Sequence, residues 1–294
     1  MYHIIEKYKL SSLHLMVVIL GLTGVFGKLI SLDAIQLVWY RMFIAFITLS
    51  LFLVYKKGLF SIKTKDFFGI LGVGALVTFH WLCFFQSIKV STISVAVVCL
   101  ATSSLFSALI EPMFFKRKLL KYEVFMGIVV IAALIFILGA ETQYLWGYFY
   151  GIMAAFLGTL FTLCNAKYIK KVGAAKITMI EMLAGVLIIS CVLLIQQDYT
   201  VFTSLISVTD FSYLLILGTL CTAMVFVWMT ETMKHITPYS LIMAINLEPI
   251  YSIILALVIF GDSELMSISF YIGSSVIIGI VFLEGYLKNK IESC

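Results

Sequence analysis

Three neighbouring residues in the last fifth of the chain, Asn246, Glu248 and Pro249, could act chemically together. They lie near the middle of a long apolar stretch. Pro249 has no backbone N–H, so a helix through it leaves a carbonyl about one turn earlier without a partner. A carboxylate beside such a break can bind a cation or a proton, and the Asn246 amide can hydrogen-bond a solute. The alternative is a neutral glutamate that stabilises a kink.

A second candidate group combines an imidazole with aromatic rings. His80 is followed by Trp81 and Phe84, and residues four apart share one face of a helix. Histidine titrates near neutral pH, and aromatic faces attract cations. We predict that this face contacts an amphipathic or aromatic solute. The alternative is a packed histidine that is bonded to a neighbouring helix.

Charged side chains inside apolar stretches are functional hypotheses, because their burial in lipid is unfavourable by kilocalories. Arg41 is expected near the outer face and Glu181 near the inner face, where they would act as gating partners at opposite mouths. For these two and for Lys28, snorkelling to the interface is the alternative. For Glu231 the alternative is an ion pair with Lys234, three residues away. The candidates for gating or coupling are Lys28, Arg41, Glu181 and Glu231.

Three further residues complete the predicted solute contacts. Ser103 lies near the middle of its apolar stretch, although small residues there also permit close helix packing. Asn165 ends a stretch beside Lys167, and Trp228 lies one helical turn before Glu231. The predicted contacts are His80, Trp81, Phe84, Ser103, Asn165, Trp228, Asn246 and Glu248.

The sequence has no motif for a metal, a cofactor or a covalent reaction. The six cysteines have neither the spacing of a metal site nor that of a disulfide framework. There is no His-Glu-x-x-His, no Gly-x-Ser-x-Gly and no phosphate-binding loop. We therefore expect no catalytic residue, no metal and no cofactor, and we expect that the chain is not an enzyme.

The elements that position these residues follow from composition. The chain is 63% hydrophobic and 12% charged, with a mean hydropathy of +1.13, whereas soluble domains are about 25% charged. Apolar stretches close to the roughly 20 residues that span a bilayer are continuous, which favours helices over the alternating strands of a barrel. The sequence predicts an all-α polytopic membrane protein with ten transmembrane helices, at about 13–30, 36–55, 67–88, 92–114, 123–140, 146–166, 177–195, 211–233, 239–259 and 268–287.

The basic residues indicate the orientation. When the ten stretches alternate across the membrane, most lysines and arginines fall on the side of the termini, and cytoplasmic loops carry such an excess. We expect both termini to be cytoplasmic, in a multi-pass protein of the cell (inner or plasma) membrane. Anionic lipid headgroups explain these short basic loops, so we expect no nucleic acid partner.

The two halves of the chain resemble each other. Residues 85–138 align with 231–284 without a gap, and Arg41-Met42 aligns with Glu181-Met182. Five stretches in each half would turn the second half upside down, and the basic loop 116–118 indeed corresponds to the acidic loop 262–264, as the positive-inside rule requires. We predict two inverted five-helix repeats, 1–141 and 142–294. Such repeats are typical of transporters, with a site between the halves.

One segment resembles a known family. Asn246-Leu247-Glu248-Pro249-Ile250-Tyr251, followed by Gly261-Asp262-Ser263-Glu264, is similar to the Glu-Pro helix and Gly-Glu-like turn of the EamA-like permeases in the drug/metabolite transporter superfamily. The junction Ser87-Ile88-Lys89-Val90-Ser91 is also similar to that family's. The first half departs from the pattern, because the expected mid-helix proline is replaced near Ser103 and Glu111-Pro112 comes later. The resemblance implies a central cavity lined by helices 1, 3, 4, 6, 8 and 9, and a solute such as an amino acid or a related amphiphile.

The sequence therefore predicts a secondary transporter (permease) for a small organic metabolite that works by alternating access, with proton coupling left open. The alternatives are a channel and an intramembrane enzyme, but neither a filter loop nor a catalytic cluster is present. The expected partners are a small-molecule substrate and the lipid bilayer. The identity of the solute, the direction of transport, the coupling ion and the oligomeric state, including a homodimer, stay open.

Overall fold

A computed structural model describes residues 9–57, 62–203 and 205–292. Within these ranges the chain is helical and contains no strand, which confirms the all-α prediction. The ends of the chain, residues 1–8 and 293–294, lie outside the described residues, so the membrane side of the termini stays a prediction.

The helices of the first half are α2 (Lys9–Leu29), α3 (Ala34–Tyr55), α4 (Thr64–Val90), α5 (Ile93–Leu100), α6 (Ser103–Phe115) and α7 (Lys121–Ala140). Those of the second half are η1 (Thr142–Tyr144), α8 (Leu145–Tyr168), α9 (Ala174–Ile195), α10 (Thr200–Thr203), α11 (Val208–Gly218), the π-helical η2 (Thr219–Met224), α12 (Val225–Thr232), α13 (Pro238–Ile245), α14 (Glu248–Phe260), η3 (Gly261–Glu264) and α15 (Ile268–Glu292).

Nine helical stretches in the described part of the chain are long and apolar enough to cross a membrane. Four of them contain more than one element, because α5 continues into α6, η1 leads into α8, α11 continues through η2 into α12, and α13 continues through α14 into η3. The tenth expected span corresponds to α15, whose apolar part, Ile268–Leu283, is shorter. The predicted helices therefore exist, and the count of ten holds only when this last one is included.

The fourth and ninth spans are broken in the same way. The fourth span consists of the eight-residue α5 and the 13-residue α6. The ninth span consists of the eight-residue α13 and the 13-residue α14. Two residues separate the helices of each pair. A threonine side chain caps the start of each pair, since Thr92 accepts the N–H of Val95 and Thr237 accepts that of Ser240. The two repeats thus share a discontinuous helix as well as a hydropathy pattern.

This equivalence corrects the sequence alignment by one residue. The alignment paired Ser91 with Thr237, whereas the caps pair Thr92 with Thr237. The physical reason is that the residue whose side chain binds the first free backbone N–H groups decides where a helix begins. The second and seventh helices need no correction. Both α3 and α9 have 22 residues, their bounds match the pairing of Arg41 with Glu181, and each is followed by a left-handed residue, Lys57 or Gln197.

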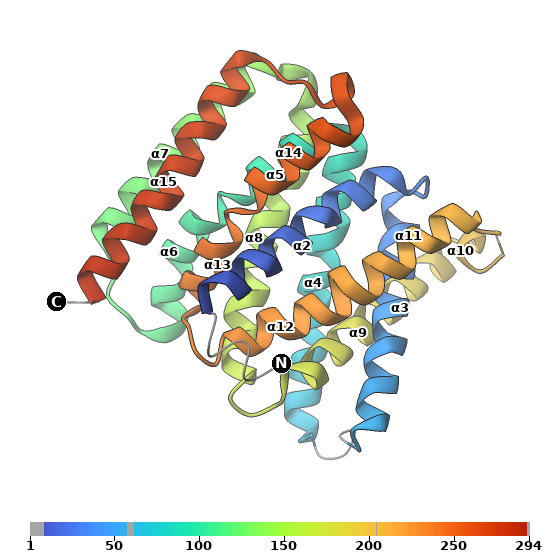
Figure 1. Ribbon diagram of the computed structural model, residues 1–294. Coiled ribbons are helices and arrows are strands. Elements are labelled where there is room, and N and C mark those ends of the chain that lie inside the picture. The colour runs from blue at the N-terminus through green and yellow to red at the C-terminus, as the bar shows by residue number, and fades with distance from the viewer. Residues whose placement is uncertain (1–8, 58–61, 204, 293–294) are drawn as a thin grey trace.

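The two halves pack against each other along several helix pairs. Figure 1 shows α7 and α15, the last helix of each half, side by side along one edge of the molecule. In the interior α4 packs on α8 and α9, while α2 packs on α14. The approach of α4 to α9 is close enough to require a glycine, because a Cβ added at Gly74 would lie 2.5 Å from the Cβ of Ala184.

Candidate functional site

A cavity of about 90 Å³ lies between the two halves. This is room for several waters or for part of a small solute. Seven of the expected spans contribute to its wall: the six helices that the resemblance implied, and in addition α3 through Arg41. The lining residues are Leu20, Thr23, Arg41, His80, Trp81, Phe84, Leu100, Ser103, Ala155, Gly158, Thr159, Phe161, Thr162, Phe226, Met229, Ile242, Ile245, Asn246 and Glu248.

Aromatic rings from both halves form one wall of the cavity. The rings of Trp81 and Phe226 meet edge to face with centroids 4.7 Å apart, and Phe161 stacks on Phe226 at 6.0 Å. His80 lies against Phe161 at 5.3 Å and is roughly parallel to Phe84 at 6.4 Å. The predicted group of His80, Trp81 and Phe84 therefore borders the cavity together, whereas sequence reasoning missed the partners Phe161 and Phe226.

His80 combines the two interpretations that the sequence left open. It borders the cavity, and its Nδ1 lies 2.7 Å from the carbonyl oxygen of Ala154 on α8. A carbonyl only accepts hydrogen bonds, so Nδ1 carries a proton. The bond fixes the orientation of the ring and leaves Nε2 as the group that can exchange a proton or accept a hydrogen bond.

Arg41 is fully buried beside the cavity. Its Nε donates to Thr222 Oγ1 at 2.6 Å, and its guanidinium lies 3.9 Å from the centre of the Trp81 ring. Its complete burial and its inward contact with Thr222 exclude the snorkelling alternative, whereas a position near the outer mouth stays a prediction. The Arg41 side chain points inward because its partner Thr222 lies in η2, a π-helical turn. Such turns are frequent at functional sites. There the Thr222 hydroxyl donates to Leu217, five residues earlier.

The two terminal nitrogens of Arg41, Nη1 and Nη2, have no hydrogen-bond partner among the described residues. A buried charge without a partner is strongly unfavourable. These nitrogens are therefore the strongest unsatisfied donors at the cavity.

The breaks of the two discontinuous helices contact each other at the cavity. Ser103 begins α6 and donates through Oγ to Asn246 Oδ1 at 2.9 Å, while Asn246 Nδ2 donates to the Ala101 carbonyl at 3.4 Å. The Ala101 carbonyl also accepts the backbone N–H and the hydroxyl of Ser104, so the Asn246 amide adds a bond from the second repeat to a carbonyl that already has partners. The two predicted solute contacts Ser103 and Asn246 thus join the two repeats.

Glu248 is the first residue of α14, directly after the break. The sequence predicted a kink at Pro249 inside one helix. The structure instead starts a new helix, and Pro249 occupies its first turn, where no backbone N–H is needed. The Glu248 carboxylate accepts no hydrogen bond from the described residues, and Arg41, although it interacts electrostatically with Glu248, forms no ion pair with it. The α14 N-terminus favours the negative charge.

Two predicted solute contacts lie outside the lining of this cavity. Asn165 is buried one helical turn beyond Thr162 on α8, and its Nδ2 donates to Glu181 Oε1 at 2.7 Å. Trp228 is buried on α12 between the lining residues Phe226 and Met229, and its side chain is not part of the wall. Both helices are apolar on most sides, so hydropathy did not determine which face turns to the cavity.

Asn165 and Glu181 form a separate buried polar pair. Neither side chain is exposed, and one oxygen of each, Asn165 Oδ1 and Glu181 Oε2, lacks a hydrogen-bond partner among the described residues. Glu181 was expected near the inner mouth, where it would act as a gating partner or snorkel to the interface. Its complete burial excludes the snorkelling alternative.

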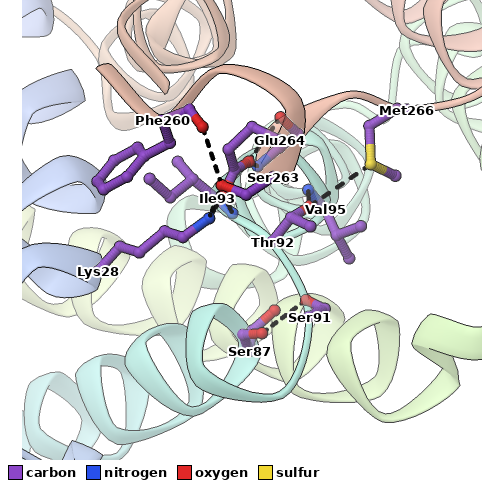
Figure 2. Close-up of polar contacts among 11 residues, drawn as sticks. Lys28, Ser87, Ser91, Thr92, Ile93, Val95, Phe260, Ser263, Glu264 and Met266 are labelled. Atoms are coloured by element: carbon purple, nitrogen blue, oxygen red, sulfur yellow. Dashed lines mark hydrogen bonds and ion pairs between the residues drawn. The ribbon is translucent and has the colours of Figure 1, made fainter. Parts of the chain in front are cut away.

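Lys28 belongs to a polar network at one end of the cavity helices, shown in Figure 2. Its Nζ binds Glu264 Oε1 at 2.7 Å and donates to Ser263 Oγ at 3.1 Å. The Glu264 carboxylate is fully buried and also accepts the backbone N–H groups of Ile93, at 3.1 Å, and Ser94, at 3.2 Å. Glu264 therefore neutralises the start of α5 and joins it to α2. Sequence reasoning missed this role, although Glu264 closes the Gly-Asp-Ser-Glu turn.

The basic loop after α6 has its own ion pairs. Arg117 binds Glu111 at 3.1 Å and Glu123 at 2.8 Å. Burial lowers the pKa of Arg117, but the hydrogen bond to Glu123 and the charge of Glu111 outweigh it, so the pKa is raised. The predicted pairing of Glu231 with Lys234 is confirmed at 2.7 Å. Glu231 is thus paired with a lysine two residues beyond the end of α12, and it does not border the cavity.

Comparison with known proteins agrees with this architecture. The sequence model of the EamA-like transporter family matches residues 9–139 and again residues 145–285. No curated protein sequence matches the chain. A solved structure described as "Crystal structure of protein" superposes with a TM-score of 0.66 at 14% identity, over 92% of this chain and 96% of the other, which shows a shared fold. Because the family model covers most of the chain in two copies, the chain belongs to the EamA-like transporter family.

Proposed function

We propose that this membrane transporter is a permease that moves a small organic metabolite, an amino acid or a drug-like amphiphile, across the cell membrane by alternating access. The contact that carries the proposal is the hydrogen bond of 2.9 Å between Ser103 and Asn246. It joins the equivalent breaks of the two repeats directly at a shared cavity. Discontinuous helices that meet at a repeat interface are the usual place for a transporter site.

The closed end of the cavity, in this proposal, is the end that holds Lys28 and Glu264. In the proposed orientation the η3 turn and the start of α5 face the outside. The bonds from Glu264 to Lys28, Ile93 and Ser94 then hold the outer mouth shut. Opening that mouth requires these bonds to break, while the cytoplasmic ends of the helices close.

Proton coupling, in this proposal, uses Glu248. The carboxylate borders the cavity without a hydrogen bond from the described residues, so a proton can reach it from either mouth in turn. The buried Glu181 carboxylate, whose hydrogen bond within the described residues comes from Asn165, is a second candidate for the proton. Ionisable groups inside a membrane often have this role.

The test is solute exchange in proteoliposomes. An untargeted metabolite comparison of cells with and without the protein supplies the candidate solutes, and counterflow of each is then measured. We expect saturable exchange that Asn246→Ala strongly reduces. The matched control is Gln196→Ala, which removes an exposed amide side chain at the end of α9, outside the cavity lining. Single-channel currents, or flux that does not saturate, would contradict a carrier and support a channel.

A further inference from the structure

We infer that a sodium ion binds between Asn165 on α8 and the residues Thr178 and Glu181 on α9, where both helices pack on α4. This ion site is separate from the solute cavity, because none of the three residues lines that cavity. It goes beyond the proposed function, and its test requires no knowledge of the solute.

Three buried oxygen atoms form the ion site. Asn165 Oδ1, Thr178 Oγ1 and Glu181 Oε2 have no hydrogen-bond partner among the described residues, and all three residues are 0% exposed. Glu181 Oε1 accepts a hydrogen bond from Asn165 Nδ2 at 2.7 Å. Glu181 is in none of the salt bridges of the described residues. A buried carboxylate with one neutral partner is unfavourable by several kcal/mol, so this carboxylate favours a bound cation.

Helix geometry brings the three oxygens together. Thr178 lies three residues before Glu181 on α9, and residues with this spacing share one face of a helix. A helical side chain points back over the preceding turn, so the Glu181 carboxylate extends toward Thr178. The hydrogen bond from Asn165 Nδ2 places the other end of that amide, Oδ1, beside the same carboxylate.

The part of α4 that packs on this group is apolar. A Cβ added at Gly74 would lie 2.8 Å from the Cα of Glu181, and one at Gly69 would meet the Tyr168 hydroxyl. Asn165 lies one helical turn before Tyr168 on α8, so the pair of Asn165 and Glu181 flanks the segment of α4 from Gly69 to Gly74. This segment, Gly-Ile-Leu-Gly-Val-Gly, offers no polar side chain. The first half of the chain therefore supplies no partner for the three oxygens.

The chemistry of these oxygens selects a small monovalent cation. Carboxylate and neutral oxygens are ligands of hard cations, and no three His, Cys, Asp or Glu side chains of the described residues gather as they do around a transition metal. One carboxylate balances one positive charge, whereas a divalent ion would leave a net charge buried. A proton on Glu181 could bridge to Asn165, but it would leave the Thr178 hydroxyl without a partner. The close packing at Gly74 favours sodium over the larger potassium ion.

A sodium ion in this position would act on the contact between the two halves. The helix α4 belongs to the first half and carries His80, Trp81 and Phe84 to the solute cavity. On α8, Asn165 lies one turn beyond Thr162, which lines the same cavity. An ion that neutralises the α8–α9 surface facing α4 should therefore stabilise the present position of α4.

The first test needs only the wild-type protein. Thermal unfolding of the purified full chain in detergent is followed in sodium, potassium and choline chloride at equal ionic strength, at about pH 8 so that few protons compete for the carboxylate. We expect the unfolding temperature to rise with sodium in a saturable way, with an affinity for sodium at least about tenfold above that for potassium. Equal responses to sodium and potassium, or no response to sodium, would overturn the inference.

The second test assigns the ion to its ligands. Thr178→Val keeps the branched shape and removes only a hydroxyl that has no partner among the described residues, so this variant should fold. Glu181→Gln removes the charge, and Asn165→Leu removes the amide. We expect each change to weaken sodium binding by about tenfold or more. A wild-type sodium response in Thr178→Val and in Glu181→Gln would overturn the site.

Two further variants are the controls. Thr48→Val removes a hydroxyl on α3 that donates to the Ile44 carbonyl, and it should keep the sodium response. Glu248→Gln changes the carboxylate at the solute cavity, and it should also keep this response. A sodium response that is lost in Glu248→Gln and kept in Glu181→Gln would place the ion in the solute cavity and contradict the inference.

Counterflow in proteoliposomes separates the ion site from the proposed function. Saturable solute exchange by a protein whose stability does not respond specifically to sodium leaves the transporter proposal intact and overturns the inference. Sodium-specific stabilisation that depends on Glu181, without any solute exchange, supports the inference and contradicts the transporter proposal.

Discussion

The network around Glu264 gives a quantitative prediction about how the cavity is closed. Its carboxylate binds Lys28 at 2.7 Å and accepts the N–H groups of Ile93 and Ser94 at 3.1 and 3.2 Å. In Glu264→Gln the negative charge is lost. One carboxylate oxygen is replaced by an amide NH2 group, which is itself a donor and cannot accept a bond from Lys28, Ile93 or Ser94. Lys28 and the start of α5 would then lose their common partner.

The magnitude follows from these contacts. Hydrogen bonds to a charged group contribute about 1.5–3 kcal/mol, and the side chain of Lys28 is 27% exposed, so solvent screening reduces its share. The amide oxygen of Gln can still accept part of these bonds, so we expect a net destabilisation of the closed start of α5 close to the loss of a single hydrogen bond, about 1.4 kcal/mol, which corresponds to about a tenfold change in the opening equilibrium.

Hydrogen exchange measured by mass spectrometry provides the assay. Peptides that cover the start of α5 should exchange about tenfold faster in Glu264→Gln. Peptides from the start of α13, where Thr237 provides an equivalent cap, should stay unchanged. Asp262→Asn is the control variant, because it removes a charge from the same turn while no hydrogen bond of its side chain is formed within the described residues. Unchanged exchange at α5 in Glu264→Gln would refute the role assigned to this network.

Three further predictions concern the site, the packing and the topology. Glu248→Gln should abolish or strongly weaken solute exchange while normal amounts of protein reach the membrane, and wild-type rates would remove Glu248 from the mechanism. Gly74→Ala should destabilise the protein by about 1–3 kcal/mol, because its Cβ would lie 2.5 Å from Ala184; thermal unfolding in detergent measures this. Gly72→Ala is its control, since nothing lies within 4 Å of that Cβ, and equal effects would contradict the packing argument. Tags at the two ends should be accessible from the same, cytoplasmic side, whereas labelling from opposite faces would require an odd number of spans.

Much of the fold could be predicted because the bilayer imposes one length on every apolar helix. The pairing of Arg41 with Glu181 was predicted from the sequence, and the bounds of α3 and α9 agree with it. The pairing in the broken helices was wrong by one residue. There the threonine caps, rather than the hydropathy pattern, determine where the helices begin.

The site was harder to predict than the fold. His80, Trp81, Phe84, Ser103, Asn246 and Glu248 border the cavity as a group, because polar and aromatic residues in the middle of a span are uncommon and therefore noticeable. Asn165 and Trp228 lie outside its lining, because a helix that is apolar on most sides does not reveal its rotation. The inward position of Arg41 depends on Thr222 in a π-helical turn, for which the sequence carried no recognised signal.

The claim that the two halves alternate around the cavity is tested most directly by paired distances. Spin labels would be placed across the outer mouth, at Asp33 and Leu265, and across the inner mouth, at Lys118 and His235. Distance distributions are then compared between the otherwise wild-type protein and Glu264→Gln. Alternating access predicts that weakening the Lys28–Glu264 network lengthens the outer distance and shortens the inner one. Two distances that lengthen together, or an outer distance that grows while the inner one stays fixed, would contradict it.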